Sequence, residues 1–398
     1  MINACIVGLG CRGYELLKSV IIKNKAINVV AVCDMYEDRI ERALKCLEEN
    51  GTQNVKGFTD YKEALATDGV QAAYVFTDWS SHTDIAVYAM EQGIAVASEV
   101  GCEYSIDNCY RLINAYEKTG TPYMFMENCC YGETELLATS MIRKGKFGTI
   151  VHCSGSYSHD LRKEIAYGHV NRHYRFDNYK NRNCDNYPTH DIGPIAKVLD
   201  INRGNRILTV SSFASKSVSL EEYIKECNDA TEEMKNTKFK QGDIITTVLT
   251  CANGETILLR LDTTLPRSYS RDFTVRGTKG YYSQTTDTVF LEGGSEWVTD
   301  YKNSGKYKEE FLPDIWKNIT PEEKEAGHGG MDWFVYKAFT DALENGTEMP
   351  IDVYDAATWM AVSVLSEISI AQGGAPQNMP DFTDGKWMFR PRKDVVSL

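Results

Sequence analysis

Short apolar runs alternate with amphipathic stretches over the first 126 residues of the chain. The apolar runs predict strands at 2–7, 27–33, 71–77, 94–98 and 122–126. The stretches between them predict helices at 13–22, 36–50, 60–66, 81–92 and 105–118. Strands that alternate with helices favour a parallel sheet with helices on both faces. We therefore expect an α/β domain over residues 1–126.

The pattern changes after residue 126. It predicts a helix up to about residue 144, an alternating strand at 149–159, a polar loop at 160–186 and a helix at 189–199. The span 207–290 is rich in predicted strands, with Asn253-Gly254 as a hairpin turn and a polar helical insertion at 219–240. Further helices are expected at 333–345, capped by Asp332, and at 353–371. We expect residues 127–398 to form a substrate domain with an open, mainly antiparallel sheet, whose last helices can pack back on the first domain.

Gly8, Gly10 and Gly13 follow the first predicted strand with the spacing G-x-G-x-x-G. In a Rossmann dinucleotide-binding domain such glycines form the tight turn, admit the pyrophosphate and let helix and strand pack closely. Asp34 ends the second predicted strand, about twenty residues later, where an acid accepts the ribose 2′-hydroxyl of NAD. The alternative is a glycine turn with an unrelated surface Asp. The combination favours an NAD site, and Asp34 favours NAD over NADP.

Other candidate cofactor-binding residues occupy the fingerprint and the segments that follow later strands. Parallel strands end at one edge of a sheet, where ligands of such sheets bind. The candidates are Cys11, Arg12, Thr77, Trp79, His82, Glu99, Asn128 and, in a glycine-rich segment near residue 330, His328. We expect the cofactor to meet the second domain there, in a site between the two domains.

Histidine and tyrosine are concentrated at the start of the second domain. Five of the seven histidines lie between residues 152 and 190. Both residue types can transfer protons at a hydroxyl or carbonyl. The spacings place Tyr157 with His159 on one strand face, and Tyr187 with His190 on one helix face. A position near a helix N-terminus favours neutral His190, which could act as a base. Structural hydrogen bonding is the alternative for any single histidine. Metal binding is the rival use of the cluster, although no H-E-x-x-H motif or cysteine pair supports it.

Composition narrows the function classes. The formal net charge of −13 and the lack of a basic stripe disfavour nucleic acid and anionic membranes as partners. No apolar run is long enough to span a bilayer, and no leader precedes the first strand. The 12 cysteines include no C-x-x-C pair and no zinc-type spacing, so no metal is expected. Free thiols favour the cytoplasm.

The chain resembles the Gfo/Idh/MocA oxidoreductases and, within that superfamily, is most similar to glycoside hydrolase family 109, the NAD-dependent α-N-acetylgalactosaminidases. The similarity rests on six segments: Met126-Glu127-Asn128-Cys129-Cys130-Tyr131, Tyr157-Ser158-His159-Asp160-Leu161-Arg162, Tyr187-Pro188-Thr189-His190, Leu265-Pro266-Arg267-Ser268-Tyr269-Ser270-Arg271, Gly327-His328-Gly329-Gly330-Met331-Asp332 and Asp352-Val353-Tyr354-Asp355-Ala356-Ala357. It implies that Tyr157, His159, Tyr187, His190 and Tyr269 surround substrate and cofactor. It also implies a reaction without net redox change: C3 oxidation, C2 deprotonation with C1 elimination, water addition and C3 re-reduction.

Some residues depart from the patterns of these families. Many Gfo/Idh/MocA dehydrogenases carry a catalytic lysine where this chain has Val100, and an aspartate where it has Asn186. Family 109 usually has glycine where this chain has Asp191, which can alter substrate choice. The favoured function is a redox-neutral glycosidase acting on a small-molecule glycoside, as a homodimer or homotetramer. The alternatives are a sugar or cyclitol oxidoreductase and a non-catalytic sensor.

Overall fold

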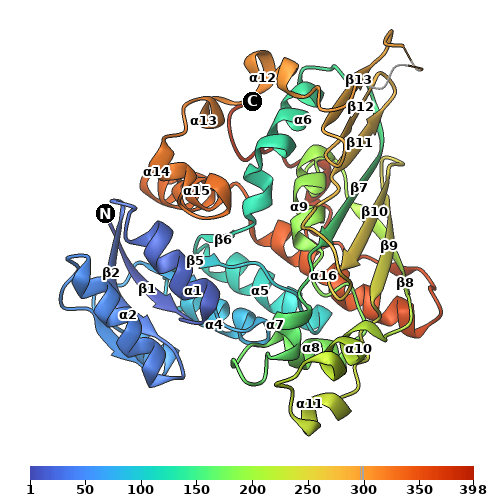
Figure 1. Ribbon diagram of the computed structural model, residues 1–398. Helices are drawn as coiled ribbons and strands as arrows, with labels where there is room; N and C mark the ends of the chain where they lie inside the picture. Colours follow the sequence, from blue (N-terminus) through green and yellow to red (C-terminus); the bar gives the residue numbers. More distant parts are fainter. Residues whose placement is uncertain (296, 298–299) are drawn as a thin grey trace. The chain divides into compact units, whose positions relative to one another are not determined.

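The computed structural model describes residues 1–295, 297 and 300–398 (Figure 1). Contacts between Cα atoms divide the chain into two compact units. The first comprises Met1–Tyr131 and Asp314–Ala357, and the second comprises Gly132–Pro313 and Thr358–Leu398. A segment from the last quarter of the chain is therefore an integral part of the N-terminal unit, and the two units are described separately below.

The first unit is built on a six-stranded sheet in which every paired strand is parallel. Its strands run in the order β3-β2-β1-β4-β5-β6, the doubly wound order of Rossmann domains. They are β1 (Ile2–Val7), β2 (Ile27–Cys33), β3 (Lys56–Phe58), β4 (Ala72–Val75), β5 (Ala95–Ser98) and β6 (Tyr123–Phe125). The helices between them are α1 (Cys11–Leu16), which continues into a π-helical turn at Leu17–Ile21, α2 (Glu37–Glu49), α3 (Tyr61–Leu65), α4 (Trp79–Glu91) and α5 (Ile106–Thr119), and β6 leads into a 3-10 turn at Asn128–Tyr131.

The late segment of the first unit packs on this sheet through aromatic side chains. It contains α13 (Asp314–Lys317), α14 (Pro321–Lys324), a 3-10 turn at His328–Gly330 and α15 (Met331–Asn345). Tyr336 and Phe339 of α15 lie against Tyr74 of β4, with ring centroids 5.7 and 5.5 Å apart. All three side chains are buried. Because burial of large aromatic rings is strongly favourable, this contact fixes α15 to the sheet.

The second unit is built on an eight-stranded sheet with the order β13-β12-β11-β7-β10-β9-β8-β14. Only the β7–β10 pair is parallel among the strands that the structure describes. The strands are β7 (Ile150–Ser158), β8 (Ile207–Ala214), β9 (Ile244–Cys251), β10 (Thr256–Asp262), β11 (Thr274–Gly277), β12 (Gly280–Ser283), β13 (Thr288–Leu291) and β14 (Gln377–Asn378). The β9–β10 hairpin turns at Asn253-Gly254, where Gly254 has a φ of 98°.

Helix α9 (Thr189–Val198) packs closely on β7 (Figure 1). Gly155 permits this approach, because a Cβ there would lie 2.7 Å from Cβ of Asp191 and 3.3 Å from Ile195. The other helices of the unit are α6 (Glu133–Arg143), α7 (Arg162–Ala166), α8 (Arg175–Asn181), α10 (Ser219–Glu226), α11 (Glu232–Asn236), α12 (Gly305–Phe311), the 3-10 turn Lys386–Met388 and the part of α16 (Val353–Ala371) that begins at Thr358.

The expected fold class is confirmed, and the structure corrects several local expectations. Strand β3 at residues 56–58 was not expected. The expected loop at 160–186 contains α7 and α8, two short helices that bury Ile165, Phe176 and Tyr179. Helices this short are not stable alone and depend on tertiary packing, which residue propensities do not reveal. Asp332 does not cap α15: the N-cap is Gly330, and Asp332 lies inside the first turn.

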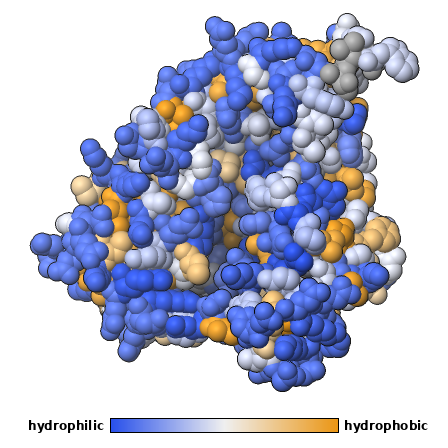
Figure 2. All heavy atoms as spheres, viewed as in Figure 1, coloured by the Kyte–Doolittle hydropathy of each residue, from blue (hydrophilic) through white to orange (hydrophobic). Residues whose placement is uncertain are grey.

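Figure 2 shows a surface that is mostly hydrophilic, with apolar side chains scattered over it. Within the described ranges 1–295, 297 and 300–398, we find no helix with both the length and the apolar character that a bilayer crossing needs.

Candidate active site

The glycine fingerprint forms the turn that joins β1 to α1. Gly8 has a φ of 98°, and a Cβ there would lie 2.6 Å from the backbone of Phe76. A Cβ on Gly13 would lie 2.1 Å from the Gly8 carbonyl oxygen. Around Gly10, in contrast, the nearest atom to an added Cβ is Arg39 Nη1 at 3.6 Å. Gly8 and Gly13 are therefore required by the fold, whereas the space at Gly10 is left open, as close approach of a pyrophosphate requires.

Asp34 lies directly after β2, beside this turn. Its carboxylate accepts hydrogen bonds from the backbone N–H groups of Leu9 at 2.7 Å and Tyr36 at 3.1 Å. Nη1 of Arg39 lies 3.5 Å from the same carboxylate. The fingerprint turn and the acid at the end of the second strand are thus held together, which is the arrangement that a dinucleotide ribose needs.

The candidates that follow β4 form one packed group. Helix α4 begins earlier than expected, so Trp79 and His82 lie in its first turn, next to Thr77. His82 Nε2 lies 3.0 Å from the Thr77 carbonyl oxygen, and burial lowers the pKa of His82. Trp79 is buried against Gly101, where an added Cβ would lie 2.5 Å from the indole ring. Trp79 and His82 therefore fix the conformation of the segment after β4 by packing and hydrogen bonding, whereas Thr77 remains partly exposed.

Three further candidates contact one buried carboxylate, that of Asp332, and a fourth, Glu99, is bound to one of the three, Arg12. Nη1 and Nη2 of Arg12 each donate to it at 2.9 Å, and Asn128 Nδ2 donates at 2.7 Å. His328 Nδ1 lies 2.8 Å from Oδ2 of the same group. Nε of Arg12 also donates to Glu99 Oε2 at 2.9 Å. The sequence identified Arg12, Glu99, Asn128 and His328 as separate candidates. It did not predict that Asp332 connects them, because Asp332 was expected only to cap a helix.

Charge determines the ionisation of this group. Burial alone would raise the pKa of Asp332, but Arg12 and His328 outweigh burial and hold that pKa well below its usual range. The hydrogen bond to Asp332 in turn raises the pKa of His328, against the effect of burial. Asp332 is therefore ionised at neutral pH, and protonation of His328 is favoured.

These residues fit an NAD-type cofactor. The open space at Gly10 and the buried acid Asp34 lie at the carboxyl ends of neighbouring parallel strands. Cys11, between Gly10 and Arg12, is exposed. Gly8, Gly10, Cys11, Arg12 and Gly13 would hold the phosphates, and Asp34 would hold the adenosine ribose.

The second unit contains a compact cluster of tyrosine and histidine rings. The Tyr157 and Tyr187 centroids are 4.5 Å apart, and His190 lies 5.5 Å from Tyr157 and 4.8 Å from Tyr187. Tyr187 Oη lies 3.4 Å from His190 Nε2. Gly155 and Tyr157 share one face of β7, so the glycine that admits α9 also brings the first turn of α9 beside Tyr157. Tyr157, Tyr187 and His190 are all buried.

The two remaining candidates extend the cluster toward solvent. His159 Nδ1 lies 3.5 Å from Tyr157 Oη, and the His159 ring is 5.3 Å from that of Tyr269. Tyr269 is 46% exposed, and its hydroxyl accepts a hydrogen bond from Arg271 Nη1 at 3.3 Å. The structure thus brings all five predicted catalytic side chains into one group within the second unit.

Sequence reasoning missed Arg175, whose guanidinium belongs to the same cluster. Its Cζ lies 5.0 Å from the centroid of the Tyr187 ring, and Nε pairs with Glu164 Oε1 at 2.7 Å. Burial alone would lower the pKa of Arg175, but Tyr174, Tyr157 and Glu164 outweigh it and raise that pKa further. The signal in the sequence was a basic residue close to several aromatic residues. Residue 175 was expected in a loop, however, and a loop does not predict which way a side chain faces.

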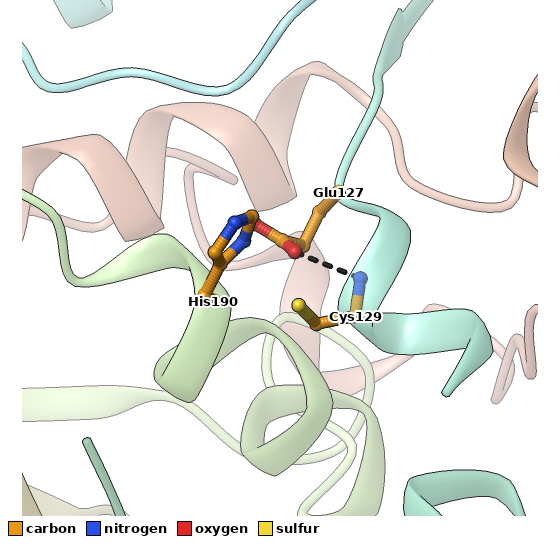
Figure 3. A group of neighbouring side chains, drawn as sticks. All are labelled: Glu127, Cys129 and His190. Carbon is orange, nitrogen blue, oxygen red and sulfur yellow. Dashed lines mark hydrogen bonds between the residues drawn. The ribbon is translucent and has the colours of Figure 1, made fainter. Parts of the chain in front are cut away.

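Figure 3 draws Glu127 and Cys129, which belong to the first unit, and His190, which belongs to the second. His190 lies in the first turn of α9. On the segment after β6, the backbone N–H of Cys129 donates to Glu127 Oε1 at 2.9 Å. Cys129 and Cys130 are both buried, and Asn128 between Glu127 and Cys129 is the residue that reaches Asp332.

Comparison with known proteins identifies the family. Residues 131–389 match the model of the glycosyl hydrolase 109 C-terminal domain, and residues 2–126 match the NAD-binding Rossmann fold of the oxidoreductase family. The chain belongs to glycosyl hydrolase family 109. A family 109 protein of Stenotrophomonas maltophilia is 38% identical, with 100% of this chain and 92% of that protein covered. An alpha-N-acetylgalactosaminidase of Tannerella forsythia is 34% identical, with 98% and 88% covered.

Solved structures share the fold at low sequence identity. Levoglucosan dehydrogenase in complex with NADH aligns with a TM-score of 0.70 at 15% identity, over 96% of this chain and 99% of that one. Myo-inositol 2-dehydrogenase from Lactobacillus plantarum aligns with a TM-score of 0.68 at 13% identity, over 95% and 99%. This family 109 chain therefore has the architecture of sugar and cyclitol dehydrogenases.

The fingerprint glycines offer a matched pair of substitutions. Gly13→Ala places a methyl group on the Gly8 carbonyl and should lower the free energy of unfolding by roughly 1–3 kcal/mol, as overpacking does. Gly10→Ala meets no atom closer than 3.6 Å and should change that free energy by less than about 0.5 kcal/mol. It should nevertheless weaken NAD binding, because the methyl group occupies the phosphate approach. Denaturant unfolding without cofactor and calorimetric titration with NAD measure the two effects, and unchanged NAD affinity in Gly10→Ala would contradict this assignment.

Proposed function

We propose that this protein is an NAD-dependent, redox-neutral glycoside hydrolase that acts on α-N-acetylgalactosaminides or related glycosides. One observation carries the proposal: a chain that matches its family 109 relatives over its full length holds three proton-transfer side chains, Tyr157, Tyr187 and His190, in mutual contact. Full-length similarity to an alpha-N-acetylgalactosaminidase supports the substrate class.

The proposed chemistry needs a hydride acceptor and a base. NAD, when bound, supplies reversible oxidation at C3 of the sugar. A C3 ketone acidifies the proton on C2, and His190 is the proposed base that removes it. Tyr187, whose hydroxyl lies 3.4 Å from His190 Nε2, can take part in the same proton transfer. Loss of the C1 substituent and addition of water then complete hydrolysis.

This route suits the side chains that the cluster offers. Most glycosidases place two carboxylic acids on either side of the scissile bond, and NAD-dependent enzymes are an exception to that rule. The candidate residues of the second unit are tyrosine, histidine and arginine side chains. Position 100 holds a buried valine, which cannot transfer a proton, so the proton step falls to the cluster.

Assembly and compartment complete the proposal. Leu258 pairs with Val248, and Phe213 pairs with Thr246, so Phe213, Val248 and Leu258 share one face of the second sheet, where all three are exposed. Such a face supports a homo-oligomer, a dimer or tetramer, which light scattering of the purified protein would test. None of the 12 cysteines, all of which lie in the described residues, forms a disulfide, which supports a cytoplasmic location that cell fractionation would test.

Asp34 should determine the choice of cofactor. Its carboxylate favours the ribose hydroxyls of NAD and repels the 2′-phosphate of NADP, while Arg39 is the nearby residue that could favour NADP. Asp34→Ala should weaken NAD binding by roughly 1–3 kcal/mol, the scale of a hydrogen bond to a charged group. Calorimetric titration with both cofactors tests this, and equal affinity of the unaltered protein for NAD and NADP would contradict it.

His190 should be required for the proton step but not for NAD binding. His190→Ala should lose about two to four decades in turnover, the range for a positioned general base. In deuterated water, the unaltered protein should give a sugar product that carries deuterium at C2, measured by NMR. His152→Ala is the matched control, because His152 lies on the same sheet as the cluster and is hydrogen-bonded to Thr256 at 2.8 Å.

Two results would count against this assignment. Full activity of His190→Ala would transfer the role to Tyr157, Tyr187 or Tyr269. A product without deuterium at C2, formed at an undiminished rate, would argue for direct displacement at C1 rather than elimination.

A further inference from the structure

The strongest unexplained feature of the first unit is a carboxylate with no access to solvent. The side chain of Asp332 is 0% exposed, and it accepts hydrogen bonds from Arg12 and Asn128 while lying 2.8 Å from His328 Nδ1. These three partners come from α1, from the turn after β6 and from the glycine-rich segment before α15. All three are candidate cofactor residues, whereas Asp332 itself is enclosed behind them.

The fold is built to keep this carboxylate in place. Asp332, Tyr336 and Phe339 are spaced four and three residues apart, so they share the face of α15 that packs on Tyr74. Gly327 has a φ of 90°, and a Cβ there would lie 2.4 Å from Asp332 Oδ2. The segment before α15 therefore closes over the carboxylate only because residue 327 is a glycine.

The geometry around Arg12 shows what the carboxylate does. Two nitrogens of the guanidinium bind Asp332, and the third binds Glu99, so its plane and its position are fixed from two sides. Arg12 belongs to the glycine fingerprint, between Cys11 and Gly13, and lies in the first turn of α1. An ion pair at this depth is costly to break from one side, because the remaining charge stays buried without its partner.

We propose that Asp332 is the positioning residue of the cofactor site: it holds Arg12, Asn128 and His328 in their binding arrangement and thereby slows the release of NAD. This inference rests on the proposed function in one respect: slow release of NAD is an advantage in a redox-neutral reaction, because that reaction returns the cofactor to its starting state. The test measures only NAD binding. The inference can therefore be wrong while the proposed hydrolysis is right, and the proposed hydrolysis can be wrong while the inference is right.

The test compares two Asp→Asn substitutions on one helix. Asp332→Asn keeps the side-chain shape but removes the charge that holds Arg12. Asp341→Asn is the matched control, because Asp341 lies on the same helix, is half-exposed and pairs with Lys337. Fluorescence of bound NADH gives the dissociation constant and, after displacement by excess NAD, the release rate. Asp332→Asn should raise both by about tenfold or more, the scale of a lost charged hydrogen bond, and Asp341→Asn should change neither.

A double substitution separates positioning from general support of the fold. If Asp332 acts through Arg12, the loss of NADH affinity in Arg12→Met combined with Asp332→Asn should be no larger than the greater single loss. Fully additive losses, or an unchanged dissociation constant in Asp332→Asn, would overturn the proposal.

The His328→Ala variant covers the case in which Asp332→Asn does not fold. The His328 side chain is 45% exposed, so its removal should leave the fold intact while Asp332 loses one of its partners. NADH release should then be faster than in the unaltered protein, and an unchanged release rate would overturn the proposal.

Discussion

A buried carboxylate can remain ionised only if the fold supplies charged or hydrogen-bonding partners, and in the first unit this requirement joins distant parts of the chain. Asp332 binds Arg12 and Asn128, so the fingerprint turn, the end of β6 and the start of α15 meet at one group. Aromatic packing of α15 on Tyr74 keeps the carboxylate at that place. The dinucleotide-binding unit is therefore completed by a late segment that begins only at Asp314.

In the second unit, the packing of a helix on a strand holds the buried rings of Tyr157, Tyr187 and His190 together. Gly155 lets α9 approach β7, and this contact brings His190 and Tyr187 beside Tyr157. Arg175 lies over the Tyr187 ring from the adjoining helix α8. Side chains that can exchange protons are thus fixed by packing, as catalysis by positioned acids and bases requires.

Much of this arrangement follows from local sequence patterns. The apolar runs predicted β1 and β2 with their observed bounds, and the glycine spacing with Asp34 located the cofactor turn. Asn253-Gly254 predicted the β9–β10 hairpin. These features depend on short-range sequence rules, which a single chain displays directly.

The features that escaped prediction depend on contacts between distant residues. Helices α7 and α8 are too short to be recognised from propensity, and they form because apolar side chains on them become buried. The role of Asp332 could not be read from its position before an aromatic helix, since its partner Arg12 lies 320 residues away.

The most direct test of the central claim counts two products in one reaction. Purified protein with bound NAD is given a nitrophenyl α-N-acetylgalactosaminide, and the released nitrophenol and the accumulated NADH are measured together by absorbance. A redox-neutral glycosidase should release many equivalents of nitrophenol for each bound NAD, with no net NADH, and should lose this activity when NAD is removed. Absence of nitrophenol release from the glycoside, together with steady formation of NADH in a parallel reaction with free sugars and added NAD, would contradict the account and identify an oxidoreductase.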